Sequence, residues 1–307
     1  MKLAVYGTGG VGGFFGGKLA RSGVDVRFVA RGSHLRALQA RGLGVASVHG
    51  DFVLHPVIAT NDPAEIGPVD YVLITVKSYH TDEVAARLGP LLHGDTAVVS
   101  LQNGVDNEEK LAAAVGVERV VGGAAYIFCT ISQPGVIEHT GGPTAITVGE
   151  WAGGRSERVA RLVEACQKAG FGAEETGNIR STLWTKFAFI CALAGTTAAI
   201  RLPIGEIRTA PSSRELFHAV VAEVCEVGRA EGIDLPADLP DRHLAFADGL
   251  DGDSYSSLYH DLTHGRAMEL DALLGEVVRR GAEAGVATPM SQALYAILQP
   301  WALRNRQ

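Results

Sequence analysis

Three glycines near the start of the chain have the spacing G-x-G-x-x-G, which lets backbone amides approach a phosphate group closely. They lie in the run Gly7, Thr8, Gly9, Gly10, Val11, Gly12. An apolar run at residues 2–6 precedes them and a small-residue segment follows, which is the order of a strand, a turn and a helix. Gly7 permits the turn, Gly9 the approach of a pyrophosphate, and Gly12 close packing of the helix. All six residues are therefore candidates to bind a dinucleotide at a helix N-terminus. The alternative is a purely structural glycine turn.

The next predicted strand ends in a basic residue. Apolar side chains alternate at Val24, Val26 and Phe28, and the run closes on Arg31. In NAD-binding folds an acidic residue about 20 positions past the glycines binds the ribose 2′-hydroxyl. A guanidinium at this place would instead pair with a 2′-phosphate. Arg31 therefore favours NADP(H) as the cofactor, although an exposed surface arginine would give the same sequence.

Two further polar residues end predicted buried strands. Lys77 closes the apolar run at residues 69–77, and Asn103 lies at the end of the run at 96–104. Ligands of doubly wound sheets bind beyond the carboxyl ends of the strands. Lys77 and Asn103 are therefore candidates to border the cofactor. The alternative is that each only ends its strand with a polar side chain.

A single charged residue, Lys186, lies between Arg180 and Arg201 in an otherwise apolar stretch. A lysine in such a helix either extends its ammonium to the surface or lies desolvated in a site. Desolvation disfavours the ammonium form and suits the group to proton transfer near neutral pH. We therefore predict that Lys186 is a proton donor.

Ser257 and Glu269 are candidates for a site further along the chain. They are twelve residues apart, so on one predicted helix over residues 257–285 they would share roughly the same face. His260 and His264 between them have a spacing that could hold a metal ion. The sequence shows no third ligand for them, so we expect no metal.

The predicted elements divide the chain into two domains. Strands and helices alternate up to about residue 149, with helices expected at 81–92 and 108–114, which predicts an α/β fold with a Rossmann-type doubly wound sheet. After Gly177 the pattern is helical. The helices expected there cover residues 180–194, 213–231, 257–285 and 290–303. We therefore expect an NADP-binding Rossmann-like domain at residues 1–177 and an all-helical substrate and catalytic domain at residues 178–307.

Composition narrows the class of protein and its partners. The 307 residues are 47% hydrophobic, which is enough for two cores, and the net charge of −7 without a basic cluster disfavours nucleic-acid binding. Four widely spaced cysteines suggest free thiols in a reducing compartment. The first predicted strand leaves no room for a signal peptide, and no purely apolar run reaches the length of about 18 residues that spans a membrane. We expect a cytoplasmic protein with a small-molecule substrate and no nucleic-acid or membrane partner. Its long helices could also pack in a homodimer.

Taken together, the motifs resemble those of the ketopantoate (2-dehydropantoate) 2-reductase family over nearly the whole chain. They are G-T-G-G-V-G at 7–12, V-A-R-G at 29–32, V-K at 76–77, Q-N-G at 102–104, W-T-K at 184–186 and S-x11-E at 257–269. The resemblance implies NADPH-dependent reduction of ketopantoate to pantoate by hydride transfer, in pantothenate biosynthesis. It implies that Lys186 protonates the keto oxygen.

The same resemblance implies a role for each remaining candidate. Glu269 would be the second catalytic residue and would contact the substrate-side hydroxyl or the nicotinamide ribose. Asn103 would touch both cofactor and substrate, and Ser257 the substrate carboxylate. Arg31 and Lys77 would bind the adenine-side phosphate and the cofactor.

The sequence departs from the family pattern after the lysine. The family helix usually carries asparagines one and two turns later, where this chain has Ile190 and Ala194. Losing two amide donors removes hydrogen bonds that would orient pantoate's hydroxyl groups. Three alternatives therefore stay open: a reductase of a less polar 2-oxoacid, a non-catalytic NADP-binding sensor, and an imine or opine-type reductase.

Overall fold

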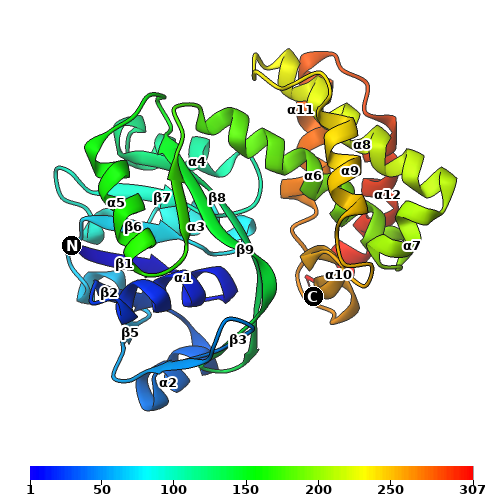
Figure 1. The fold of residues 1–307 in the computed structure, drawn as a ribbon. Helices are drawn as coiled ribbons and strands as arrows, with labels where there is room; N and C mark the ends of the chain where they lie inside the picture. The colour runs from blue at the N-terminus through cyan, green and yellow to red at the C-terminus, as the bar shows by residue number, and fades with distance from the viewer. Residues whose placement is uncertain (307) are drawn as a thin grey trace. The chain divides into compact units, whose positions relative to one another are not determined.

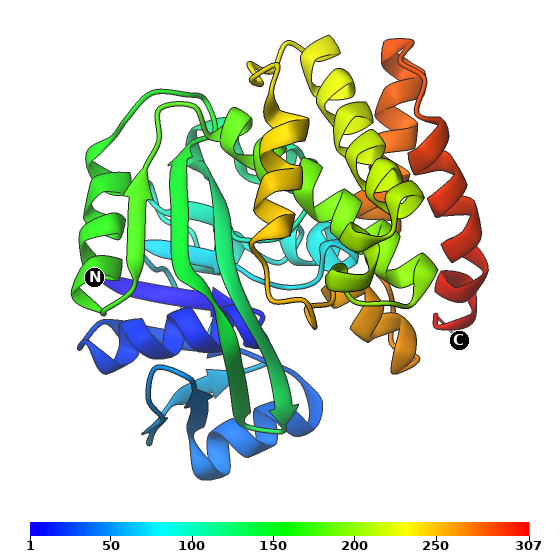
Figure 2. The ribbon, with the colours of Figure 1, turned by 45° about the vertical axis from the view of Figure 1, so that its right-hand side comes forward.

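The computed structural model describes residues 1–306, and its internal contacts divide the chain into two compact units. The N-terminal unit comprises residues 1–102 and 106–179, and the helical unit comprises residues 103–105 and the chain from residue 180 onward. The division falls two residues beyond the predicted boundary, and a three-residue segment from the first half of the chain joins the helical unit. Figures 1 and 2 show the sheet of the N-terminal unit and the helices of the helical unit.

One ten-stranded sheet forms the N-terminal unit. Its strands are β1 (Lys2–Tyr6), β2 (Asp25–Val29), β3 (Leu43–Ser47), β4 (Phe52–Leu54), β5 (Ile58–Thr60), β6 (Tyr71–Ile74), β7 (Ala97–Ser100), β8 (Val120–Gln133), β9 (Val136–Glu150) and β10 (Gly172–Glu175). Their order is β4-β3-β9-β8-β7-β6-β1-β2-β5, with β10 beside β9. Every neighbouring pair from β5 to β8 is parallel, which confirms the predicted α/β class. The central strands β6 and β7 are buried along their whole length, as their apolar runs predict.

The strand–helix alternation is interrupted before residue 149 by an antiparallel hairpin of β8 and β9 that was not predicted from the sequence, and it resumes with α5 (Glu157–Lys168) and β10. Pro134 and Gly135 connect the two strands, and Gly135 has a φ of +88°, a conformation that favours glycine. β9 also pairs parallel with β3 and β10, and β3 pairs antiparallel with β4. The sheet is therefore mixed rather than wholly parallel, and Figure 2 shows its long hairpin. The outer half of β8 is exposed, so it lacks the continuous apolar run of a buried strand.

Helices α1 (Gly10–Arg21) and α5 (Glu157–Lys168) contact each other on one face of the sheet (Figure 1). Small residues bring α1 close to the strands: a Cβ added at Gly16 would lie 2.6 Å from Val5. The other helices of this unit are α2 (Gly32–Arg41), α3 (Thr81–Ala85) and α4 (Asn107–Val115). The helix expected at residues 81–92 stops at Ala85, and Pro90 begins no further α-helix but lies in a 3₁₀ turn.

The helical unit is built around α6 (Ile179–Ile200), and this part of the chain confirms the expected all-helical domain. The other helices are α7 (Ile204–Thr209), α8 (Pro211–Ala230), α9 (Leu239–Asp248), α10 (Ser257–Thr263), α11 (Glu276–Ala284) and α12 (Pro289–Arg304), with a π-helical turn, η5, at Asp271–Gly275. Side chains of α6 such as Phe187 and Cys191 form its hydrophobic core with α8 and α12. By length and composition alone α6 could cross a membrane, but core helices pass the same test, and most of α6 is buried.

The prediction of a single helix over residues 257–285 is wrong. The chain leaves helical conformation after Thr263, and Gly265 has a φ of +64°. Helical structure resumes only at Asp271. Ser257 and Glu269 therefore do not share the face of one helix, because Glu269 lies in the irregular segment between helices. The many helix formers in this stretch concealed the interruption that Gly265 permits.

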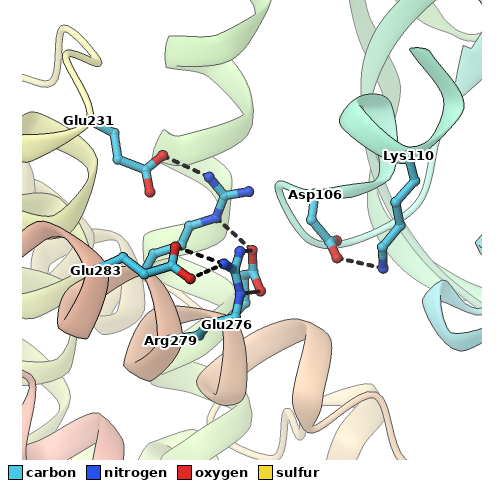
Figure 3. A network of polar contacts seen from close by, with 7 residues as sticks. Asp106, Lys110, Glu231, Glu276, Arg279 and Glu283 are labelled. Carbon is cyan, nitrogen blue, oxygen red and sulfur yellow. Dashed lines mark hydrogen bonds and ion pairs between the residues drawn. The ribbon is translucent and has the colours of Figure 1, made fainter. Parts of the chain in front are cut away.

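A buried ion network fixes α11 to the end of α8 (Figure 3). Arg280 donates to Glu276 at 2.6 Å and to Glu231, which follows α8, at 2.8 Å. Arg279 also donates to Glu276. Burial alone would raise the pKa of Glu276, but hydrogen bonds from the two arginines outweigh it and lower that pKa. Each buried charge in the network therefore has a partner, which such charges require.

Candidate functional site

Three glycines of the turn after β1 lie very close to neighbouring parts of the protein. Gly7 has a φ of +104°, and a Cβ added there would lie 2.6 Å from a side-chain atom of Val76. A Cβ at Gly12 would lie 2.3 Å from the hydroxyl of Thr75. A Cβ at Gly10 would lie 2.5 Å from the backbone oxygen of Cys129. None of these glycines has room for a side chain.

Gly9 differs from the other glycines of the turn, because a Cβ added there would meet nothing within 4 Å. Gly9 is also the N-cap of α1, and no side chain caps this helix end. The first N–H groups of a helix have no intrahelical partner and favour negative charge. Thr8 is buried and its hydroxyl donates to Val29, while Val11 is half-buried. The turn therefore leaves open space beside an uncapped helix end, which fits a diphosphate group.

Arg31 stands where β2 leads into α2, as the N-cap of that helix. Its guanidinium lies 3.2 Å from the carboxylate of Glu83, and both side chains are about half exposed, at 55% and 47%. Glu83 also pairs with His80, at 3.0 Å. Glu83 was not a candidate from the sequence, because nothing in the spacing of the two residues links Glu83 to Arg31.

Lys77 follows β6 and is half-buried, directly before a 3₁₀ turn at Ser78–His80. It lies at the carboxyl end of a parallel strand, the edge at which the sequence analysis expected it. Gly7 and Lys77 lie at the ends of neighbouring strands, because β1 pairs with β6. The predicted cofactor residues of the N-terminal unit thus gather at one edge of its sheet.

Lys186 and Asn103 meet in the helical unit. The Nζ atom of Lys186 donates a hydrogen bond of 2.9 Å to Oδ1 of Asn103, although the two residues are 83 positions apart. Both side chains are half-buried. Trp184 and Phe187, on either side of the lysine in α6, are buried and pack edge to face with ring centroids 5.6 Å apart. The buried rings fix the helix so that Lys186 points its ammonium at a defined acceptor.

The remaining predicted substrate residues are placed differently from one another. Ser257 is exposed at the start of α10, whereas Glu269 is 8% exposed. The neighbouring Ser256 is buried and shares a 2.7 Å hydrogen bond with Thr197 of α6. This contact, which was not predicted from the sequence, ties the start of α10 to α6.

Ile190 and Ala194 lie one and two turns beyond Lys186 on the same side of α6. Ile190 is half-buried and packs against the helical core, and Ala194 belongs to that core at 1% exposed. Neither side chain can donate a hydrogen bond. The side of α6 that follows Lys186 is therefore apolar over two turns.

The cysteines do not form a reactive centre. Burial raises the pKa of the Cys129 and Cys166 thiols to about 12 and that of Cys225 to about 11. Cys191 is fully buried, and burial raises its pKa as well. Because the thiolate is the nucleophilic form, a raised pKa disfavours nucleophilic chemistry at these thiols near neutral pH.

One carboxyl group of the N-terminal unit is perturbed by burial. Glu108, in the first turn of α4, is 1% exposed. Burial raises the pKa of this group to about 7. Glu108 is therefore largely protonated just below neutral pH.

Comparison with known proteins covers both units of the chain. The model of the ketopantoate reductase PanE/ApbA family matches residues 3–153, and that of the family's C-terminal domain matches residues 178–302. A 2-dehydropantoate 2-reductase from Mesorhizobium japonicum is 32% identical over 332 residues, which cover 99% of each chain.

Solved structures show the same fold. The crystal structure of 2-dehydropantoate 2-reductase from Geobacter metallireducens has a TM-score of 0.92 at 31% identity, over 98% of this chain and 99% of that one. A D-mandelate dehydrogenase with NADH and anilino(oxo)acetate has a TM-score of 0.90 over 100% and 99% of the two chains, but at 22% identity it shows the fold alone. The chain belongs to the ketopantoate reductase PanE/ApbA family of oxidoreductases.

Proposed function

We propose that this protein is an NADPH-dependent 2-oxoacid reductase that converts ketopantoate to pantoate, the 2-dehydropantoate 2-reductase reaction of pantothenate synthesis. The observation that carries the proposal is the 2.9 Å hydrogen bond to Asn103 from Lys186, the single charged residue of α6 after Arg180. Binding a nucleotide alone needs no such oriented proton donor. A purely cofactor-sensing protein therefore does not account for Lys186.

The glycine turn fits the diphosphate of a dinucleotide, because only Gly9 opens onto free space beside the uncapped start of α1. Gly7, Gly10 and Gly12 keep the backbone close, and Lys77 borders the same edge of the sheet. NADPH, when bound, would supply the hydride that adds to the 2-oxo carbon, and the oxidised cofactor, NADP⁺, would then leave.

The choice of NADPH over NADH rests on Arg31. Its guanidinium would pair with the 2′-phosphate, and no acidic residue closes β2. In the structure this guanidinium is already paired with Glu83. A 2′-phosphate, with more negative charge than one carboxylate, would take over Arg31 from Glu83.

The chain's own part in the reaction is to bind and to protonate. Charge develops on the keto oxygen as the hydride arrives, and Lys186 donates its proton to that oxygen. Asn103 orients the ammonium and contacts both cofactor and substrate. Ser257 binds the substrate carboxylate, and Glu269 a hydroxyl group of the substrate or of the nicotinamide ribose.

A second candidate is reduction of a less polar 2-oxoacid. Ile190 and Ala194 favour it, because an apolar face beyond Lys186 gives no hydrogen bond to a substrate hydroxyl. The D-mandelate dehydrogenase of the same fold is an example of this architecture in an enzyme named for an aromatic 2-hydroxyacid. This candidate keeps Lys186 in the same role and changes only the substrate.

The deciding experiment is NADPH oxidation by the purified protein with ketopantoate and a panel of 2-oxoacids with apolar side chains. Lys186→Ala should lower kcat by about 100- to 10,000-fold, the range of a lost general acid. Lys168→Ala is the matched control, because Lys168 is exposed on α5 and pairs only with Glu164 on the same helix.

The outcomes separate the candidates. Turnover of ketopantoate that depends on Lys186 supports the proposal, and preference for an apolar 2-oxoacid supports the second candidate. Tight NADPH binding without turnover of any substrate would indicate a sensor instead. A Lys186→Ala variant as active as Lys168→Ala would overturn the assigned proton donor, and a requirement for an amine co-substrate would indicate an imine or opine-type reductase.

A further inference from the structure

A buried set of polar side chains surrounds the carboxyl ends of β6 and β7 in the N-terminal unit. Its members Thr81, Ser100, Gln102 and Asn107 are all at most 5% exposed. None of them was a candidate from the sequence. Polar groups this deeply buried must satisfy their hydrogen bonds within the protein.

Thr81 is the centre of this set. Its hydroxyl accepts a 2.8 Å hydrogen bond from Nε2 of Gln102 and donates one of 2.8 Å to Oδ1 of Asn107. Gln102 also donates to the backbone oxygen of Val76, at 3.0 Å, where β6 has just ended. One hydroxyl therefore connects two side chains that lie on different sides of a loop.

The loop so enclosed is the one that carries Asn103. Gln102 directly precedes Asn103, and Asn107 begins α4 three residues after Gly104. Gly104 has a φ of +110°, a conformation that favours glycine. Glycine has no side chain, so Gly104 adds no side-chain contact that would restrain the loop. Val105 of this loop is buried in the core of the helical unit, and the side chains at both ends of the loop bond to Thr81.

We infer that Thr81 is a positioning residue: its hydroxyl holds both ends of the loop 103–106 so that Oδ1 of Asn103 accepts the hydrogen bond from Lys186. The inference rests on the proposed reductase function, because it assigns Thr81 an effect on the proton donor. Thr81 acts through Gln102 and Asn107 and does not itself contact Lys186. Without its hydroxyl, Asn107 loses a donor, and the loop gains freedom at the ammonium that must be aimed.

Thr96 offers a closely matched control in the same unit. It is 0% exposed, its hydroxyl donates to the backbone of Val69 at 2.6 Å, and it accepts from the backbone N–H of His93 at 2.9 Å. Thr96 precedes β7, whereas Gln102 follows it, so Thr96 lies at the opposite end of that strand. Thr96→Val therefore removes the same number of buried hydrogen bonds without touching the loop.

The experiment compares Thr81→Val, Thr81→Ser and Thr96→Val. For Thr81→Val we expect kcat to fall by about 10- to 100-fold, the effect of a misplaced catalytic group. Thr81→Ser restores the hydroxyl and should recover kcat. Thr96→Val should lose similar stability in urea and keep its kcat.

A second measurement does not depend on activity. Backbone hydrogen exchange at residues 101–107 should be faster in Thr81→Val than in the wild type and in Thr96→Val. If the wild type reduces no 2-oxoacid, the proposed function fails, and this exchange still decides whether Thr81 holds the loop. The inference is overturned if Thr81→Val and Thr96→Val lose kcat equally, or if exchange at 101–107 is unchanged.

Discussion

At the scale of single residues, Glu83 competes with a cofactor phosphate for the positive charge of Arg31. Its guanidinium lies 3.2 Å from Glu83, so a 2′-phosphate would have to displace a carboxylate that is already there. A carboxylate at this point also repels the phosphate directly. Glu83 should therefore weaken a preference for NADPH that Arg31 would otherwise make stronger.

Glu83→Gln should lower the Kd for NADPH by about 2- to 5-fold at low salt and leave that for NADH unchanged, because an exposed ion pair contributes about 0.2–1 kcal/mol. Fluorescence titration with both cofactors measures the change. The control is Glu164→Gln, which removes a different exposed carboxylate, one that is paired with Lys168. A weaker affinity for NADPH in Glu83→Gln would show instead that Glu83 orients Arg31 for the phosphate.

Glu108 makes the stability of the protein depend on pH. Burial raises the pKa of its carboxyl from 4.5 to about 7 in the folded state. Between those values the unfolded chain releases a proton that the folded chain keeps, so stability falls as the pH rises from 4.5 through 7 and then levels off. The buried carboxylate destabilises the fold most above pH 7.

We expect Glu108→Gln to remove this dependence. The free energy of unfolding of the variant, minus that of the wild type, should be about 2–3 kcal/mol larger at pH 8.5 than at pH 5. This estimate uses the linkage of about 1.4 kcal/mol per pKa unit. Urea unfolding at the two pH values tests this, with the exposed neighbour Glu109→Gln as control. The assignment fails if the difference between Glu108→Gln and wild type is the same at both pH values.

At the scale of elements, the glycines of the turn between β1 and α1 have two different roles, packing of the helix and approach of the cofactor. Gly12 is needed for packing, since an added Cβ would lie 2.3 Å from the hydroxyl of Thr75. Gly9 has an ordinary φ of −82° and open space where its side chain would be. The structure alone gives no reason for glycine at position 9, whereas an approaching diphosphate does.

Gly9→Ala should therefore fold with a stability within about 0.5 kcal/mol of the wild type and still lose at least about tenfold in affinity for NADPH. Gly12→Ala should be destabilised by about 1–3 kcal/mol through overpacking. Thermal unfolding and NADPH titration of both variants test the distinction. Unchanged NADPH affinity in Gly9→Ala would mean that the diphosphate does not lie at this turn.

The elements also show which patterns can be read from the sequence. Buried strands such as β6 and apolar helices such as α6 follow from continuous apolar runs, because burial on all sides imposes a simple composition. The β8–β9 hairpin was missed because its outer half is exposed and carries no such run. The break after Thr263 was missed because composition continues to favour a helix, while one glycine allows the chain to turn.

At the scale of the whole molecule, the sequence predicted the candidate residues better than their partners. Lys186 was conspicuous because it is the single charged residue between Arg180 and Arg201, and the glycines because their spacing is short. Its contact with Asn103 spans 83 positions, and Glu83 reaches Arg31 across 52. Such pairs depend on how the strands are ordered in the sheet and on how the helices pack, which local patterns do not contain.

The three residues 103–105 leave the N-terminal half of the chain to join the helical unit, where Val105 is part of the hydrophobic core. A protein piece cut at residue 180 would thus carry Lys186 without Asn103, and a helical core short of one valine. Recombination between genes at this border would separate the lysine from its acceptor in the same way. The residues 103–105 and the helical unit therefore have to match each other for this contact and this core to form.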